Sequence, residues 1–161
     1  MATEIERKYL ISTLPENLLA GQIANPILQG YIAVHEDKTE VRIRRFGGQY
    51  WQTIKSPGHL SRLEFELPID EKLFHELWPL TQGRNLEKNR YDIPYLGKTI
   101  ELDVYTGHLS GLMVAEVEFE SIEESNRFTP PDWFGKEISG IRKYKNFILA
   151  SEGLPQKDSR G

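Results

Sequence analysis

The sequence contains no cysteine, and this absence removes several classes of site. Without cysteine the chain cannot form disulfides, thiolate zinc sites or a cysteine nucleophile. It has only four histidines, and no two of them stand at the i, i+4 spacing that two helical ligands of one metal would need. A metal site would therefore rely on oxygen ligands, which suit magnesium, manganese or calcium.

Long apolar stretches and an excess of positive charge are also missing. No stretch approaches the roughly 18 apolar residues of a membrane span, and the early acids Glu4 and Glu6 argue against a signal peptide. The formal net charge is −4, which argues against broad electrostatic binding to nucleic acid or to an anionic membrane. We therefore expect a cytoplasmic protein with no nucleic-acid and no membrane partner.

Several short catalytic motifs are absent as well. No segment reads G-x-x-x-x-G-K-S/T, G-x-G-x-x-G or H-E-x-x-H, the patterns of a P-loop, a dinucleotide-binding turn and a zinc protease helix. The chain also lacks G-x-S-x-G, which argues against a serine hydrolase.

Alternating segments rich in β-branched and aromatic residues make up most of the chain, and turn residues separate them. At 161 residues the chain fits one domain. Gly47-Gly48 is a hairpin signal, and Pro57-Gly58 and Gly97 mark further turns. We expect eight strands, near 4–11, 28–35, 39–46, 49–55, 62–69, 84–93, 98–105 and 113–120. The expected fold class is mainly β (α+β), an eight-stranded antiparallel β-barrel with a few flanking helices.

Helices are a minor part of the prediction. Asp70 is placed to cap a helix that Pro79 ends, and Ser121 with Glu124 forms a capping-box pattern. Apolar residues at helical spacing predict a last helix over 141–150. The expected organisation is a domain over 1–150 and a flexible C-terminal tail over 151–161.

Charged residues recur in pairs separated by one residue, which puts both members of a pair on the same face of a strand. The acidic pairs are Glu4/Glu6, Glu64/Glu66, Glu101/Asp103 and Glu116/Glu118. The basic pairs are Arg42/Arg44 and Lys88/Arg90, with Lys8, Lys55 and Arg62 in step. An ordinary sheet with its charged face in water remains one interpretation. Like charges repel, however, so their grouping favours a charged lumen, and an eight-stranded barrel is about wide enough for one small ligand.

The chemistry of such a lumen points to phosphates and metals. Several arginines and lysines in one cavity suit a ligand with several phosphates, and carboxylates bind the divalent cations that bridge to phosphate. Tyr31 either contacts the ligand or packs in the core. Lys143 and Lys145 either lie on a solvated helix face or, in one case, reach the tunnel mouth.

The ordered motifs resemble those of the CYTH superfamily, the triphosphate tunnel metalloenzymes. Glu4-Ile5-Glu6-Arg7-Lys8 matches the Glu-x-Glu-x-Lys signature of that family. Further matches follow in the family's order: Val41-Arg42-Ile43-Arg44, Thr53-Ile54-Lys55, Glu64-Phe65-Glu66, Glu87-Lys88-Asn89-Arg90-Tyr91, Glu101-Leu102-Asp103-Val104 and Glu116-Val117-Glu118-Phe119. The resemblance covers about residues 1–150 and is closest to the short, single-domain bacterial members. It implies an eight-stranded antiparallel tunnel that hydrolyses or cyclises small-molecule triphosphates with Mg²⁺ or Mn²⁺.

The resemblance also implies roles for single residues. The implied metal ligands are Glu4, Glu6, Asp103, Glu116 and Glu118. The implied triphosphate clamp consists of Lys8, Arg42, Arg44, Lys55, Lys88 and Arg90, with Tyr31 as a further candidate. Direct catalytic roles are expected for Glu4, Glu6, Lys8 and Lys55. Supporting roles, such as orienting the basic residues, are expected for Arg62, Glu64, Glu66 and Glu101.

The leading hypothesis is metal-dependent hydrolysis of inorganic triphosphate to pyrophosphate and phosphate. The charged positions account for phosphates and metals, whereas no pocket for a base or ring can be identified in the sequence. The alternatives are a class IV-type adenylyl cyclase, a thiamine or nucleoside triphosphatase, and a non-catalytic polyphosphate-binding module. A homodimer is one way to cover the apolar outer face of the barrel.

Overall fold

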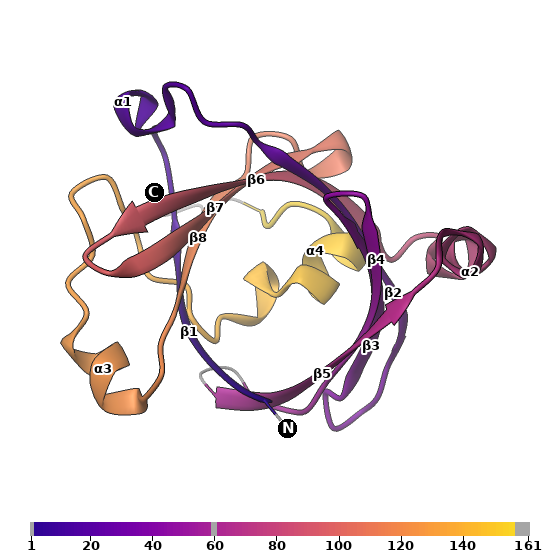
Figure 1. Ribbon diagram of the computed structural model, residues 1–161. Helices are drawn as coiled ribbons and strands as arrows, with labels where there is room; N and C mark the ends of the chain where they lie inside the picture. Colours follow the sequence, from indigo (N-terminus) through magenta and orange to yellow (C-terminus); the bar gives the residue numbers. More distant parts are fainter. Residues whose placement is uncertain (1, 59–60, 157–161) are drawn as a thin grey trace.

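Eight antiparallel strands close into a barrel in the computed structural model, which describes residues 2–58 and 61–156 (Figure 1). Around the barrel the strands follow the order β1-β5-β4-β3-β2-β6-β7-β8. Their bounds are β1 (Ala2–Leu10), β2 (Asn25–Val34), β3 (Glu40–Phe46), β4 (Gln49–Lys55), β5 (Ser61–Ile69), β6 (Asn85–Tyr95), β7 (Lys98–Thr106) and β8 (Met113–Glu118). The predicted fold class is confirmed, and each expected strand overlaps an observed one.

β1 closes the barrel because it pairs with two strands that lie far away in sequence. Its first half pairs with β5, where Glu4 lies opposite Arg62. Its second half pairs with β8, where Lys8 lies opposite Glu116. The charged side chains of β1 therefore stand between charged side chains of two neighbouring strands.

The turns follow the sequence signals where the backbone needs glycine. Gly47 and Gly48 join β3 to β4 and have φ angles of 57° and 79°. A two-residue turn that matches strand twist requires positive φ at both positions, which glycine adopts without strain. The Gly-Gly signal therefore predicted this hairpin correctly.

The helices are short and lie at the rim, the outside and one end of the barrel. α2 (Glu71–Leu77) begins as predicted, because an Asp70 carboxylate oxygen accepts a hydrogen bond from the Leu73 amide at 2.7 Å. A 3₁₀ turn, η1 (Trp78–Thr81), follows it. In α3 (Ile122–Arg127) the Ser121 hydroxyl accepts from the Glu124 amide. The sequence did not predict the four-residue α1 (Glu16–Leu19) or the 3₁₀ turn η2 (Gly107–Leu109).

The predicted helix over 141–150 is only partly correct. The structure has a 3₁₀ turn, η3 (Arg142–Tyr144), followed by α4 (Asn146–Glu152), with extended backbone at Lys145 between them. Ser151 and Glu152 of the expected tail belong to α4, and residues 157–161 lie outside the described part of the chain. The flexible tail stays a prediction.

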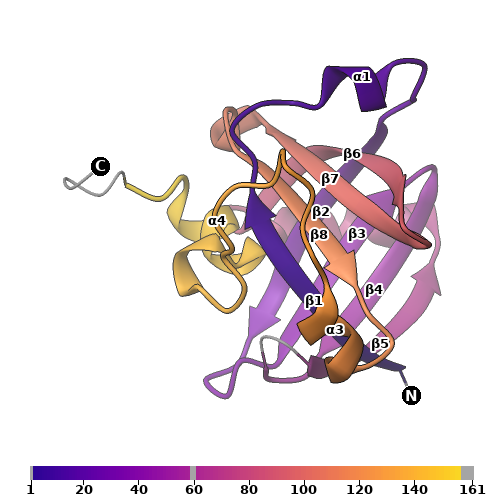
Figure 2. The same cartoon turned by 90° about the vertical axis from the view of Figure 1, so that its left-hand side faces the viewer.

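One apolar cluster fills an end of the barrel. Leu149 of α4 is fully buried and belongs to a cluster with Tyr31, Leu86, Tyr105 and Val114 from the strands. Looking down the barrel, α4 lies within the outline of the strands (Figure 1), and the perpendicular view places it at one end (Figure 2). The C-terminal segment therefore plugs this end, and the charged space lies deeper in the barrel.

A second apolar cluster covers part of the outside. Ile100, Leu102 and Val117 are fully buried, and they pack with aromatic residues of the segment after β8, including Phe128 and Phe134. On another side, Phe74 of α2 packs against Tyr50 of β4 with ring centroids 5.0 Å apart. The outer face of β5 remains open, since Phe65 and Leu67 are 43% and 55% exposed. None of the described helices is long and apolar enough to span a membrane.

Candidate active site

A charged cavity of about 450 Å³ occupies the interior of the barrel. Every site residue predicted from the sequence lines it except Asp103. The predicted residues in its wall are Glu4, Glu6, Lys8, Tyr31, Arg42, Arg44, Lys55, Arg62, Glu64, Glu66, Lys88, Arg90, Glu101, Glu116 and Glu118. The interpretation of these pairs as a solvated outer face is therefore wrong.

The strand register places opposite charges beside one another in the cavity wall. Lys55 on β4 lies opposite Glu40 on β3 and Glu64 on β5. Arg90 on β6 lies opposite Asp103 on β7. Cross-strand neighbours of opposite charge stabilise a sheet, whereas like charges destabilise it. On the acidic strands like charges also meet, since Glu6 lies opposite Glu118 and Glu101 lies opposite Glu116.

Three carboxylates converge where β1 meets β8. Glu4, Glu6 and Glu118 each offer an oxygen, and these oxygens all lie within 4.8 Å of one another. Burial raises the pKa of Glu6 well above its usual value, and the charges of Glu116 and Glu4 raise it further. Burial, with Glu4 and Glu116, also raises the pKa of Glu118. A divalent cation would relieve this repulsion, and the all-oxygen donor set suits Mg²⁺ or Mn²⁺.

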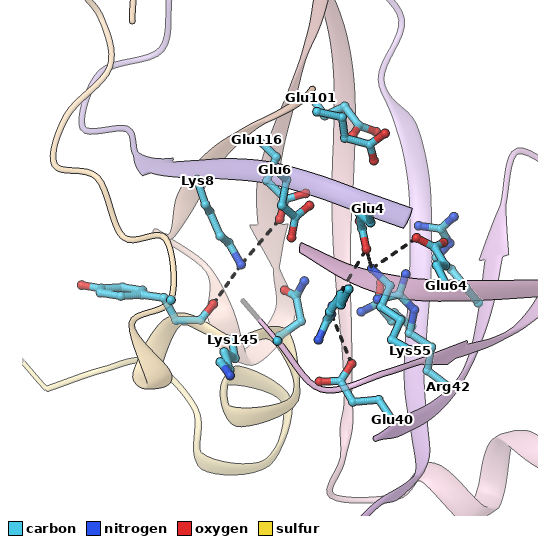
Figure 3. A pocket seen from close by; sticks show the side chains of 18 of the residues that line it. Glu4, Glu6, Lys8, Glu40, Arg42, Lys55, Glu64, Glu101, Glu116 and Lys145 are labelled. Carbon is cyan, nitrogen blue, oxygen red and sulfur yellow. Dashed lines mark hydrogen bonds and ion pairs between the residues drawn. The ribbon is translucent and has the colours of Figure 1, made fainter. Parts of the chain in front are cut away.

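Lys55 lies between two carboxylates with opposite pKa shifts (Figure 3). Its ammonium donates to a Glu4 oxygen at 2.8 Å and lies 3.8 Å from a Glu64 oxygen. Burial opposes ionisation of Glu4, but Lys55 and Arg42 outweigh it and lower the pKa of Glu4 to about 2. Burial and the Glu4 charge raise the pKa of Glu64 to about 7, although Lys55 opposes that shift. One carboxylate is therefore ionised while its neighbour can exchange a proton near neutral pH.

Asp103 holds two basic residues in place. Arg90 donates to both of its oxygens, at 2.7 and 2.9 Å, and the Lys88 ammonium lies 2.7 Å from one of them. Asp103 is only 2% exposed. Burial opposes its ionisation, but Lys88 and Arg90 hold the pKa of its carboxyl well below the usual range. Both oxygens are engaged by bases, so the geometry favours an orienting role over the metal-ligand role that the resemblance implied.

Arg42 differs from most basic residues of the cavity because no described carboxylate lies within 4 Å of it. It is 6% exposed, and its Nε has no hydrogen-bond partner in the described chain. Burial disfavours its charge, while Tyr31, which lies opposite Arg42 on β2, and Glu40 keep the pKa of Arg42 raised. The Nε of Arg44 is likewise buried without a partner. Buried guanidinium groups with open donors form a binding site for an anion.

Lys8 links the strands to the C-terminal plug. Its ammonium donates to the Tyr144 carbonyl at 2.9 Å and lies 3.7 Å from a Glu116 oxygen (Figure 3). Burial opposes ionisation of Glu116, but Lys8 and Lys88 outweigh it and lower the pKa of Glu116. The Lys8 ammonium therefore lies between the acidic cluster and the plugged end.

Tyr31 combines the two roles left open by the sequence. It lines the cavity, yet only 1% of it is exposed, and its ring packs edge-on against Phe147 at 5.4 Å. Its hydroxyl accepts a hydrogen bond from Gln29. Burial raises the pKa of Tyr31, so the hydroxyl stays neutral near pH 7.

Sequence reasoning missed several residues of the cavity wall. Glu40 lies 3.6 Å from Arg62 and is 6% exposed. It stands two residues before Arg42, so strand alternation alone would have placed it inside. The other missed wall residues are Gln29, Gly58, Ile138, Gly140, Ile141, Tyr144 and Asn146, whereas Lys145 was named as an alternative and does line the cavity. Most of these come from the C-terminal plug, for which only the alternative position of Lys143 or Lys145 gave a sequence signal.

The chain is similar to known proteins over most of its length. The CYTH domain family matches residues 2–145. An inorganic triphosphatase of Nitrosomonas europaea is 48% identical over 150 residues, covering 92% of this chain and 97% of that protein. An inorganic triphosphatase of Acetivibrio thermocellus is 35% identical over 151 residues, covering 92% and 94% respectively. The crystal structure of the inorganic triphosphatase NE1496 matches with a TM-score of 0.70 and 44% identity, covering 94% of this chain and 96% of that one.

Proposed function

The chain belongs to the CYTH domain family, and on that premise we propose that it hydrolyses inorganic triphosphate to pyrophosphate and phosphate. One observation carries the proposal: the cavity places an acidic cluster beside buried guanidinium Nε donors that have no hydrogen-bond partner within the described part of the chain. The cluster is Glu4, Glu6 and Glu118, and the open donors belong to Arg42 and Arg44. A polyphosphate with a divalent cation supplies what each half lacks.

The basic residues bind and orient the phosphate chain in this proposal. Arg42 and Arg44 stand two residues apart on β3 and present forked donors to the same cavity. Lys88 and Arg90 present an ammonium and a further guanidinium to the cavity from β6, with Asp103 fixing their orientation. Lys8 and Lys55 add point charges on the side of the acidic cluster. Together they hold the substrate in one position and balance the charge that develops on the phosphoryl oxygens.

Glu4, Glu6 and Glu118 would hold the divalent cation, with Glu116 close to the same cluster. A bound divalent cation polarises a phosphoryl group and neutralises its charge. Mg²⁺ and Mn²⁺ both suit these ligands, and a metal titration distinguishes them.

Glu101 also has a pKa of about 7 but is held by Arg90 at 2.6 Å, so Glu64 is the carboxylate better suited to accept a proton during hydrolysis. It lies beside Lys55, and its pKa of about 7 lets it be ionised or protonated near neutral pH. As water attacks the terminal phosphorus, the new oxygen–phosphorus bond forms, a proton passes to Glu64, and the bridging bond to pyrophosphate breaks. Lys8 and Lys55 donate hydrogen bonds to the oxygens on either side.

The proposal is tested with a panel of tripolyphosphate, ATP and thiamine triphosphate, each with EDTA, Mg²⁺ or Mn²⁺. We expect metal-dependent release of phosphate and pyrophosphate, with the highest kcat/KM for tripolyphosphate. Cyclic AMP from ATP would identify a cyclase, and faster turnover of ATP or thiamine triphosphate would identify a different triphosphatase. Calorimetric binding of tripolyphosphate without turnover would identify a binding module.

Two further predictions concern the protein in the cell. We expect a homodimer to form through the exposed outer face of β5, where Phe65 and Leu67 lie. Light scattering tests this by measuring whether the mass in solution is that of one chain or two. The cytoplasmic location stays a prediction that cell fractionation can check.

A further inference from the structure

Glu40 is a buried acidic residue of the cavity wall to which the proposed function gives no role. It lines the cavity, is 6% exposed, and its carboxylate points into the cavity in Figure 3. Its Oε2 has no hydrogen-bond partner within residues 2–58 and 61–156. The Nη2 of Arg62 lies 3.6 Å from this oxygen, which is too far for a hydrogen bond. Leaving a buried acceptor unpaired costs free energy, which indicates a functional reason for an acid at this position.

Glu40 is separate from the acidic cluster that would hold the divalent cation. Among the described residues that cluster consists of Glu4, Glu6 and Glu118. Arg62 on β5 lies between the two groups, because its Nε is 3.9 Å from a Glu4 oxygen while its Nη2 faces Glu40. A guanidinium therefore separates Glu40 from the cluster, which argues against a role as a ligand of the same cation.

Glu40 begins a row of three charged residues on the inner face of β3. Arg42 and Arg44 follow it at every second position, and all three line the cavity. Neighbours in this row are about 7 Å apart along the strand, twice the rise per residue. Glu40 lies toward the plugged end, since it pairs with Val34 of β2, and Val34 packs against the apolar cluster that contains Leu149 of α4. A carboxylate thus ends the row of guanidinium groups.

The volume of the cavity does not by itself limit the length of a bound phosphate chain. At about 450 Å³ the cavity falls in the size range of pockets that hold drug-sized ligands. Arginine and lysine bind any phosphate group, so the basic clamp does not distinguish three phosphates from four. An acid at the end of the clamp does distinguish them, because carboxylate and phosphate oxygens both accept hydrogen bonds and repel each other.

We propose that Glu40 sets the length of the phosphate chain that the cavity accepts, by excluding a fourth phosphate from the plugged end of the clamp. This inference rests on the proposed function, which supplies the clamp and its tripolyphosphate ligand. Specificity of this kind requires a repulsive element against the wrong ligand as well as contacts with the right one. Arg42 and Arg44 provide the contacts, and Glu40 provides the repulsion. Glu40 is then a specificity-determining residue that takes no part in bond cleavage.

The first test compares Glu40→Gln with Glu36→Gln, which removes an exposed acid from the turn before β3. Initial rates are measured with Mg²⁺ or Mn²⁺ on tripolyphosphate and on tetrapolyphosphate. For Glu40→Gln we expect kcat/KM to rise at least about tenfold for tetrapolyphosphate and to change less than about threefold for tripolyphosphate. Glu36→Gln should change neither value, and Glu40→Asp, which keeps the carboxylate, should retain most of the wild-type preference. An unchanged preference in Glu40→Gln, or an equal loss of activity on both compounds, would overturn the proposal.

The second test measures binding and needs no turnover. Calorimetry in EDTA gives the dissociation constants of tripolyphosphate and tetrapolyphosphate for the wild type and for Glu40→Gln. We expect the wild type to bind tetrapolyphosphate more weakly, and the ratio of the two constants to fall at least about tenfold in the variant. Hydrolysis of tripolyphosphate by a protein whose binding ratio is the same in Glu40→Gln would overturn this inference alone. A binding preference that Glu40→Gln removes, in a protein that hydrolyses neither compound, would support the inference and reject the proposed function.

Discussion

At the scale of single residues, the basic side chains of the cavity fall into two classes. Arg90 is neutralised by Asp103 and Glu101, which lie 2.7 and 2.6 Å from its donors. Arg42 is equally buried but has no described carboxylate within 4 Å. Carboxylates hold the first class in position in the cavity wall, whereas the second class keeps donors that only the substrate would engage.

The two classes predict opposite effects of the same substitution. Arg90→Gln should lower the free energy of unfolding by about 3–5 kcal/mol, because it leaves Asp103 buried with one partner fewer. Arg42→Gln should change it by less than about 1 kcal/mol but raise the KM for tripolyphosphate at least about tenfold. Urea unfolding in EDTA and steady-state kinetics measure the two effects. Equal destabilisation by both variants would contradict the distinction.

The sequence predicted the positions of these residues better than their partners. The period of two residues along a strand is fixed, so alternation placed Glu64, Arg42 and Lys88 inside correctly. Asp103 and Glu116 look alike in the sequence, however, because each belongs to an acidic pair. Only the register shows that Asp103 lies opposite Arg90 whereas Glu116 lies opposite Lys8. Partners depend on which distant strands pair, and this information is not local.

At the scale of elements, the strands and a C-terminal helix could be predicted, but the position of that helix as a plug in the barrel could not. Each strand carries its own alternation, so local pattern was sufficient. Ile148, Leu149 and Ala150 are consecutive and all buried, because the barrel end surrounds α4 on more than one side. The apolar spacing over 141–150 predicted a helix there, and α4 overlaps it, but the spacing carries no sign that the helix lies at the end of the barrel. The strand residues that bury α4 come together only when the barrel closes, so the local sequence of α4 does not reveal its position.

α2 offers a test in which stability and activity separate. It covers the outside of the barrel through Phe74. Its N-cap residue Asp70 bonds the helix backbone and does not line the cavity. Asp70→Ala should lower the free energy of unfolding by about 1 kcal/mol, the usual effect of losing a helix cap. The kcat/KM for tripolyphosphate should stay unchanged. As a control, Glu71→Ala removes an exposed acid that makes no capping bond and should be less destabilising. A loss of activity in Asp70→Ala would show that α2 supports the site.

At the scale of the whole molecule, the excess of buried acids predicts how stability depends on pH. Burial and neighbouring acids raise the pKa of Glu64 and of Glu101 to about 7, from an ordinary value of 4.5. Between about pH 4.5 and 7 the unfolded chain releases protons that the folded protein keeps, so the free energy of unfolding falls as pH rises. Glu4, whose pKa is lowered to about 2, titrates below this window and does not oppose the trend.

In EDTA the protein should therefore be more stable at pH 5.5 than at pH 7.5, by at least about 2 kcal/mol. Urea unfolding at the two pH values measures the difference, and the double variant Glu64→Gln/Glu101→Gln should reduce it. Mg²⁺ at about 100 times its dissociation constant should restore about 2.7 kcal/mol at pH 7.5. A free energy of unfolding that rises with pH in EDTA would show that burial does not raise the pKa values of these cavity acids.

The central claim is that the acidic cluster and the basic clamp form one site for metal-dependent cleavage of triphosphate. The most direct measurement is phosphate release from tripolyphosphate with Mg²⁺ or Mn²⁺, for the wild type, Glu6→Gln and the surface control Glu76→Gln. Glu6 lies in the cluster, whereas the side chain of Glu76 on α2 is 61% exposed. We expect hydrolysis by the wild type and by Glu76→Gln, a loss of at least about 100-fold in kcat for Glu6→Gln, and no release in EDTA. Hydrolysis at the wild-type rate by Glu6→Gln, or none by the wild type with either metal, would contradict the claim.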